Sequence, residues 1–146
     1  SYLSRVGKGP LFTQMPREIE EYVREKGAEY GATTGRPRRI GWFDAYLARY
    51  AIKINRPNKI VITKFDVLTG LKNLKICVNY DKNPLSEENA RPFYIELKGW
   101  DNLPDTKRFD DLNEQLKNYI RSIEKEIGEK IWMISIGKER EKVIFL

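Results

Sequence analysis

The chain has 146 residues, of which 40% are hydrophobic and 33% charged, and its formal net charge is +6. This length suits one domain with a buried core, and this composition excludes an intrinsically disordered chain. No apolar run approaches membrane-spanning length, and the first ten residues lack the apolar core of a secretory signal peptide.

The chain contains no histidine and one cysteine, Cys77. Histidine general-base catalysis and His-ligated metal sites are therefore excluded within it. Cys77 cannot form an internal disulfide, which favours a cytoplasmic location, and its apolar run KICV predicts burial. The positive charge favours anionic partners, either nucleotides or nucleic acid. The opening at Ser1 on the turn-like RVGKGP leads us to expect a portion of a longer protein.

Residues 1–13 are expected to form a loop. The VGKG within them does not fit a phosphate-binding loop, because Tyr2 stands where the first glycine is required and Gly9 where Ser or Thr is required. Pro16, at a first helical position, then predicts the start of a helix that Gly27 ends.

The next segment, Gly31–Asp44 (GATTGRPRRIGWFD), gathers small, hydroxyl and cationic residues between two predicted helices. Glycines let a ligand approach the main chain closely, and guanidinium groups suit carboxylate or phosphate. Pro37 favours an extended conformation at Arg36, and in an extended run residues two apart point the same way. Arg36 and Arg38 should therefore converge on one ligand, with Arg39 turned away. We interpret the segment as an anion-binding loop; a solvated basic loop is the alternative.

A second helix is predicted over Phe43–Ile54. The residues at helical spacing that we expect to pack in the core are Phe43, Tyr46, Leu47, Tyr50, Ala51 and Ile54. The segment Lys59–Leu68 then reads as a strand covered on both faces, as in a parallel sheet. Thr63, Lys64 and Asp66 lie near its carboxyl end, where open α/β sheets place their ligands.

The remaining elements predict an α/β fold over a single domain, residues 1–146. It is a mainly parallel sheet flanked by helices, with a small antiparallel annex. The annex would be formed by the strands Leu74–Tyr80 and Phe93–Leu97. The later elements are a helix over 109–127 closed by Gly128, and strands at Ile131–Ile136 and Val143–Leu146.

The sequence Thr63-Lys64-Phe65-Asp66 resembles the guanine-reading motif [N/T]-K-x-D of GTPases. A carboxylate accepts two adjacent hydrogen bonds, and guanine offers two adjacent donors on one edge, which adenine does not. The later ISIG, with Ser135 and Gly137, is placed to touch the same base. A solvated Lys–Asp pair in a surface turn is the alternative. No phosphate loop or magnesium-binding carboxylate precedes the motif, so it represents half of a GTP site.

Six segments in order resemble the adenylosuccinate synthetase family over essentially the whole chain. They are RVGKGP (Arg5–Pro10), EYGATTGRPRRIGWFDA (Glu29–Ala45), TKFDVLTGL (Thr63–Leu71), KICVNY (Lys75–Tyr80), LKGW (Leu97–Trp100) and SIGKER (Ser135–Arg140). The resemblance implies the C-terminal portion of a P-loop-NTPase-like fold without its phosphate loop. In that portion, residues 31–44 would form the aspartate/IMP loop, 59–71 the guanine-binding strand and loop, and 131–140 a second guanine-contacting loop.

The resemblance also implies a chemistry. The family uses GTP and magnesium to phosphorylate the 6-oxygen of IMP, and L-aspartate then displaces phosphate to give adenylosuccinate. By position, the aspartate-binding residues would be Ala32, Thr33, Thr34, Gly35, Arg36, Pro37 and Arg38, with Arg36 also touching IMP. The GTP-binding residues would be Arg38, Lys64, Phe65, Asp66, Ser135, Ile136 and Gly137.

The family's glycine-rich loop, catalytic aspartate, catalytic histidine and metal ligands would lie upstream of this chain. The chain itself would then hold no catalytic residue and no metal ligand, and would be inactive alone. The resemblance further implies a homodimer. Two departures are mild: Phe65 replaces a common Leu, and Pro37 stands where some members have Arg. The competing hypotheses are a non-catalytic basic nucleic-acid-binding domain and a standalone GTP-binding module; we expect neither nucleic acid nor membrane as a partner.

Overall fold

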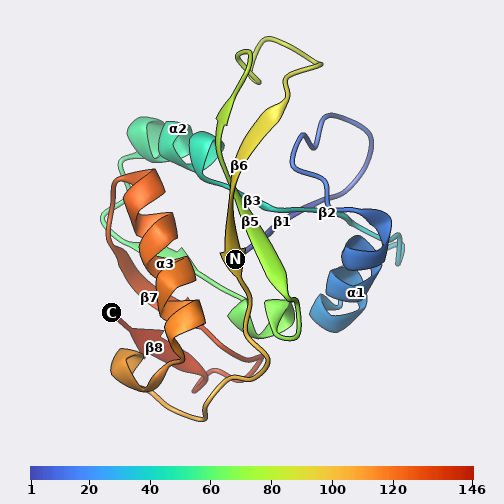
Figure 1. Ribbon diagram of the computed structural model, residues 1–146. Coiled ribbons are helices and arrows are strands. Elements are labelled where there is room, and N and C mark those ends of the chain that lie inside the picture. The colour runs from blue at the N-terminus through green and yellow to red at the C-terminus, as the bar shows by residue number, and fades with distance from the viewer.

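The computed structural model describes residues 1–146 and distributes eight strands over three small sheets (Figure 1). In the first sheet, β1 (Leu3–Arg5) pairs antiparallel with β2 (Arg39–Gly41). In the second, β5 (Asn73–Tyr80) lies between β3 (Phe43–Asp44), which is parallel to it, and β6 (Pro92–Lys98), which is antiparallel. In the third, β7 (Ile131–Ser135) lies between parallel β4 (Ile60–Ile62) and antiparallel β8 (Val143–Phe145).

The predicted α/β class is confirmed, but the expected mainly parallel sheet is wrong for this chain. Two strand pairs are parallel and three are antiparallel, so the sheets are mixed. The predicted antiparallel pairing of the two middle strands is confirmed, since Leu74 lies opposite Leu97. These strands are not a separate annex, because β5 also pairs with β3.

Three α-helices cover the sheets: α1 (Arg17–Gly27), α2 (Ala45–Asn55) and α3 (Glu114–Ile127). In Figure 1, α2 and α3 lie together on one side of the β5–β6 hairpin, and α1 lies on the other side beside β2. None of these helices combines the length and the apolar character that crossing a membrane would require.

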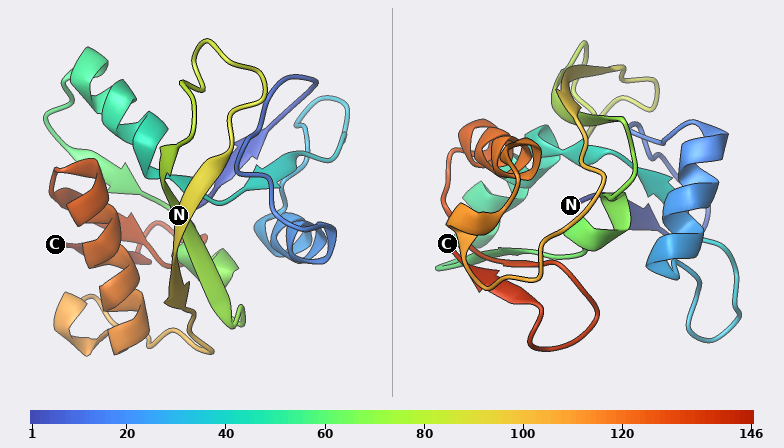
Figure 2. Two further views of the ribbon diagram at one scale, coloured as in Figure 1. Left: turned by 45° about the horizontal axis from the view of Figure 1, so that its top comes forward. Right: turned by 60° about the horizontal axis from the view of Figure 1, so that its bottom comes forward.

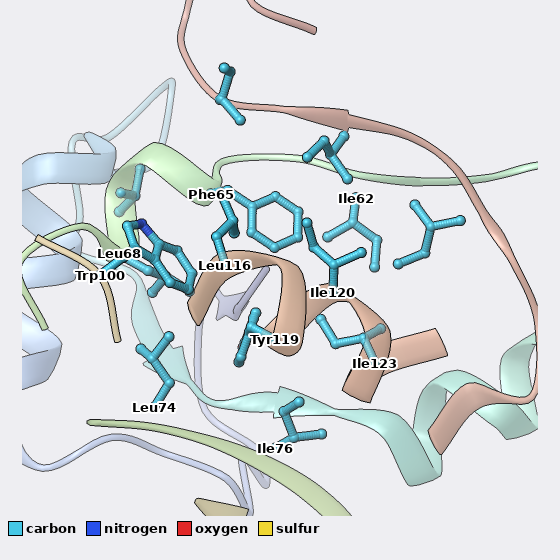
Figure 3. Packing of buried hydrophobic residues seen from close by; sticks show 14 of the residues in the cluster. Ile62, Phe65, Leu68, Leu74, Ile76, Trp100, Leu116, Tyr119, Ile120 and Ile123 are labelled. Carbon is cyan, nitrogen blue, oxygen red and sulfur yellow. The ribbon is translucent and has the colours of Figure 1, made fainter. Parts of the chain in front are cut away.

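The core is organised around an aromatic cluster of Phe65, Trp100 and Tyr119 (Figure 3). The ring centroids of Phe65 and Tyr119 are 6.2 Å apart, and those of Trp100 and Tyr119 are 5.7 Å apart, both in edge-to-face geometry. The buried stripe of α3, which includes Leu116 and Ile123, packs around them. Because Phe65 begins the short 3-10 helix η1 (Phe65–Leu68), this packing fixes the position of the predicted guanine motif.

Several boundaries in the first third differ from the prediction. The predicted loop 1–13 contains β1, which pairs with β2 inside the predicted anion loop. Pro16 is the residue before α1 and not its first residue, and the left-handed residue Ala28 follows Gly27. Cys77 is fully buried, as predicted, and burial raises the pKa of its thiol to about 12.

The second helix begins at Ala45 and not at Phe43, because the Asp44 carboxylate caps it by accepting a hydrogen bond from the Leu47 amide. Phe43 instead pairs with Ile76 in β3. The predicted core role is wrong for three residues of this helix: Tyr50, Ala51 and Ile54 are exposed. The helix buries its other side, where Ala45, Ala48 and Ile52 pack on the core.

The predicted strand Lys59–Leu68 is also shorter than expected. Only Ile60–Ile62 pairs, and burial on both faces is wrong because Val61 is 42% exposed. The chain leaves the strand at Lys64, which adopts a left-handed conformation (φ 65°), and continues as η1. The long helix begins at Glu114 and not at Phe109, since the Asn113 side chain caps it. Residues 109–111 form a separate 3-10 turn.

Candidate functional site

The two predicted guanine-contacting segments lie side by side at the carboxyl ends of β4 and β7. These strands are parallel neighbours, so the loops that follow them leave the same edge of the sheet. The amide of Lys64 donates a hydrogen bond to Ser135 Oγ over 2.9 Å. This contact joins the TKFD turn directly to the ISIG loop across 71 residues of sequence.

A pocket of about 550 Å³ opens between these segments and the end of α1. Its lining residues are Lys26, Gly27, Ala28, Thr63, Lys64, Asp66, Val67, Ser135, Gly137 and Lys138. Oδ1 of Asp66 is buried and has no hydrogen-bond partner in the chain. The volume falls in the range typical of small-molecule sites, and an unpaired buried carboxylate oxygen requires a donor. The pocket therefore has the size of a small-molecule site and carries in its wall a carboxylate with one unpaired oxygen.

Two of the predicted guanine-contacting residues point their side chains elsewhere. Phe65 is fully buried in the aromatic cluster, and Ile136 is 6% exposed. Neither side chain lines the pocket. Any contact that they make with a ligand in this pocket would have to come from their main chain.

The predicted anion loop is a compact turn on the surface. The Gly31 amide donates to the Arg36 carbonyl over 2.8 Å, and the Gly35 amide donates to the Gly31 carbonyl over 2.9 Å. Gly35 has φ 64°, a conformation that other residues resist. Residues 32–37, which contain both threonines, are exposed. In Figure 2 (right), this loop and the loop after β7 both extend toward the bottom of the view.

The three arginines of this loop differ in what they contact. Arg39 is turned away, as predicted, and donates to the Gly9 carbonyl over 2.6 Å and to Gln14 Oε1. Arg38 Nη1 donates to Glu29 Oε2 over 3.0 Å, and its buried Nε has no partner. The exposed Arg36 side chain forms no hydrogen bond in the chain. Convergence of Arg36 and Arg38 on one ligand stays a prediction.

Glu29 connects the two predicted sites, and the sequence interpretation did not assign it a role. Its Oε1 accepts hydrogen bonds from Lys64 Nζ (2.6 Å) and Tyr2 Oη (2.7 Å), while its Oε2 accepts the bond from Arg38. The Glu29 side chain is only 4% exposed. Burial opposes its ionisation, but the hydrogen bonds from Lys64 and Tyr2 outweigh burial and hold the pKa of Glu29 below its usual value. Glu29 is therefore a buried, ionised carboxylate.

Magnesium, which the resemblance implies, does not fit the residues of this chain. No three side chains of the types that ligate metals lie close enough together to hold an ion. Hard divalent cations need several oxygen ligands. We therefore derive no step through a metal from these residues.

Comparison with known proteins identifies the family. The family model for adenylosuccinate synthetase matches residues 1–144. The chain belongs to the adenylosuccinate synthetase family. It is 43% identical to the adenylosuccinate synthetase of Caldanaerobacter subterraneus subsp. tengcongensis over 100% of the chain. It is 45% identical to that of Caldicellulosiruptor bescii over 99% of the chain.

The match covers only part of those relatives. The chain spans 37% of the length of both bacterial synthetases, and therefore corresponds to a portion of an adenylosuccinate synthetase. A solved structure of fully ligated adenylosuccinate synthetase from Plasmodium falciparum matches 100% of this chain and 38% of its own, with a TM-score of 0.91 and 38% identity. The fold described above is thus the family's fold over this portion.

Proposed function

We propose that this chain acts as the C-terminal part of an adenylosuccinate synthetase. That enzyme would ligate IMP and L-aspartate to adenylosuccinate and release GDP and phosphate from GTP, in AMP biosynthesis. The observation that carries the proposal is the pocket in which Lys64, the unpaired Asp66 carboxylate oxygen and Ser135 meet. Membership of the family supports the ligation reaction proposed for the whole enzyme. The pocket supports the role proposed for this chain, which is to bind the nucleotide.

In this proposal the pocket reads guanine. Asp66 would accept the ring N1–H and the exocyclic amine of the base, which supplies the donor that Oδ1 lacks. The stem of Lys64 and the loop of Ser135 and Gly137 would pack on the base plane. Phe65 and Ile136, whose side chains are buried, would contribute main-chain contacts only.

The exposed turn beside the pocket would bind aspartate. Main-chain donors of Ala32, Thr33 and Thr34, the two threonine hydroxyls, and the side chains of Arg36 and Arg38 would surround the substrate carboxylates. Gly35, whose amide is bonded to the Gly31 carbonyl, and Pro37, which has no N–H, would line the site. Arg36 would also contact IMP, and Arg38 would be shared with GTP. The exposure of residues 32–37 and the exposed Arg36 side chain, which forms no hydrogen bond, support this assignment, because both leave donors free for an anion.

The remaining chemistry would come from outside these residues. We propose that the phosphate loop, the catalytic aspartate and histidine, and the magnesium ligands belong to the rest of the enzyme, whose sheet would be P-loop-NTPase-like. We also propose that the enzyme is a homodimer in the cytoplasm. The match to only 37% of the length of the two synthetases named above supports this division of roles, because most of such an enzyme lies outside these residues.

The test compares the longer protein that contains this sequence with the isolated chain. Each is incubated with IMP, L-aspartate, GTP and magnesium, and adenylosuccinate and GDP are separated by chromatography. The longer protein should form both products in equal amounts, and residues 1–146 alone should form neither. Absence of adenylosuccinate from the longer protein would refute the proposed function. Turnover by the isolated chain would refute the assignment of catalysis to other segments.

A nucleic-acid-binding domain stays the alternative from another class. Of the Arg36–Arg39 cluster that would carry it, Arg39 is bonded to Gly9 and Gln14, Arg38 is paired with the buried Glu29, and the exposed Arg36 is left free for a phosphate. A standalone GTP-binding module would form no adenylosuccinate in this assay, although the longer protein would still bind GTP in a separate binding titration.

A further inference from the structure

One buried carboxylate lies between the pocket and the exposed turn. Glu29 stands just before the turn, and its two oxygens face in different directions. Oε1 holds Lys64 Nζ at 2.6 Å, and Oε2 holds Arg38 Nη1 at 3.0 Å. Oε1 therefore fixes a cation of the proposed guanine site, and Oε2 fixes a cation that the proposal shares between aspartate and GTP.

The cations need this support because neither is held elsewhere by charge. Lys64 Nζ has one further partner, the neutral Gly27 carbonyl, and the Arg38 side chain has none. The side chains of Lys64 and Arg38 are 44% and 35% exposed, so without an anchor they would sample several rotamers. A carboxylate that is only 4% exposed is desolvated and binds cations more strongly than a surface acid does.

The main chain around Glu29 is fixed as well. The Arg38 amide donates to the Glu29 carbonyl over 3.0 Å, and Tyr30 and Pro37 form a β-bridge. Together these contacts close the neck of the turn. Because Glu29 Oε1 also bonds Lys64, the neck of the turn is attached to the wall of the pocket.

We infer that Glu29 is a positioning residue for both substrate sites, holding Lys64 for the guanine base and Arg38 for aspartate and GTP. It touches neither substrate and acts through the two cations. The inference rests on the proposed function, because it presumes that the pocket binds GTP and that the turn binds aspartate.

The test is Glu29→Gln in the longer protein. The amide keeps the size of the side chain but loses its charge, and one of its two polar ends becomes a donor facing a cation. Steady-state rates are measured over a grid of GTP and L-aspartate concentrations at saturating IMP. The KM for GTP and the KM for aspartate should each rise about tenfold, which is the loss of a charge-assisted hydrogen bond, while kcat changes little. A merely structural role would lower the melting temperature and the active fraction without moving either KM.

The matched control is Glu25→Gln, an exposed acid on α1, which should leave both KM values unchanged. A rise in only one KM, or in neither, would overturn the inference. The proposed function is judged separately, by whether the wild-type protein forms adenylosuccinate. If Glu29→Gln does not fold, Glu29→Asp replaces it. The shorter acid keeps the charge but cannot reach both cations, so two unchanged KM values would again overturn the inference.

Discussion

The carboxylate of Asp66 offers the sharpest test of the nucleotide site, through Asp66→Asn in the longer protein. In the wild type, both oxygens are acceptors, which match the two adjacent donors of guanine. In the variant, the amide nitrogen faces one of these donors. The variant thus loses one charge-assisted hydrogen bond and gains a donor–donor conflict, a change of about 3–5 kcal/mol in binding. Burial of Oδ1 keeps water from compensating.

At 1.4 kcal/mol for each factor of ten, kcat/KM for GTP should fall by about 10² to 10⁴. Xanthine carries a carbonyl in place of the exocyclic amine of guanine, so XTP should improve as a substrate. The assay compares kcat/KM for GTP and XTP, with Asp101→Asn, an exposed acid, as the matched control. An unchanged ratio of GTP to XTP in a folded Asp66→Asn protein would refute the role of Asp66 as the guanine reader.

Three further predictions concern the elements that support the site. The pKa of Glu29 is held below its usual value, so its contribution to stability is present above that usual value and is lost as the pH falls through the lowered pKa. The difference in melting temperature between wild type and Glu29→Gln should therefore shrink as the pH is lowered from about 6 to about 3; a constant difference would contradict this. Phe65→Leu should cost roughly 1–2 kcal/mol of unfolding free energy in urea titration, because Phe65 is fully buried. It should leave the preference for GTP over XTP unchanged, whereas an altered preference would mean that the ring contacts the base. Gly137→Ala would place a Cβ 2.8 Å from Lys142 Cβ. This overpacking should cost about 1–3 kcal/mol and raise the KM for GTP, and an unchanged KM would separate this loop from the nucleotide.

The sequence was sufficient for those parts of the site that follow directly from strand order. Lys64 follows one apolar strand and Ser135 ends another, and parallel pairing of those strands brings the two segments to one edge. The sequence likewise predicted the long helix closed by Gly128, which is α3. The role of Glu29 could not be predicted from a sequence pattern, because it depends on a hydrogen bond with Lys64, which lies 35 residues further along the chain. A general signal existed in retrospect: an acid that the fold buries must be paired with cations or donors.

The errors in the fold have a common physical cause. A run of apolar residues does not show how much of each face the rest of the chain covers. Ile60, Val61 and Ile62 read as a strand buried on both faces, yet Val61 is 42% exposed, since within this chain only one face of β4 packs on the core. The helical spacing of aromatic and aliphatic residues in α2 led to the same error at Tyr50 and Ile54, which were predicted to be in the core and are exposed.

The backbone conformation of Lys64 is unfavourable for a residue other than glycine, and contacts within the chain stabilise it. A residue other than glycine in the left-handed region costs about 1–2 kcal/mol, and Lys64 holds φ 65° at the turn between β4 and η1. Three hydrogen bonds oppose this cost: from its amide to Ser135 Oγ, and from its Nζ to Gly27 and Glu29. The burial of Phe65 in the core fixes the next residue. The turn is thus held by contacts within the chain before any nucleotide binds, and a ligand of the pocket does not have to provide the energy of ordering it.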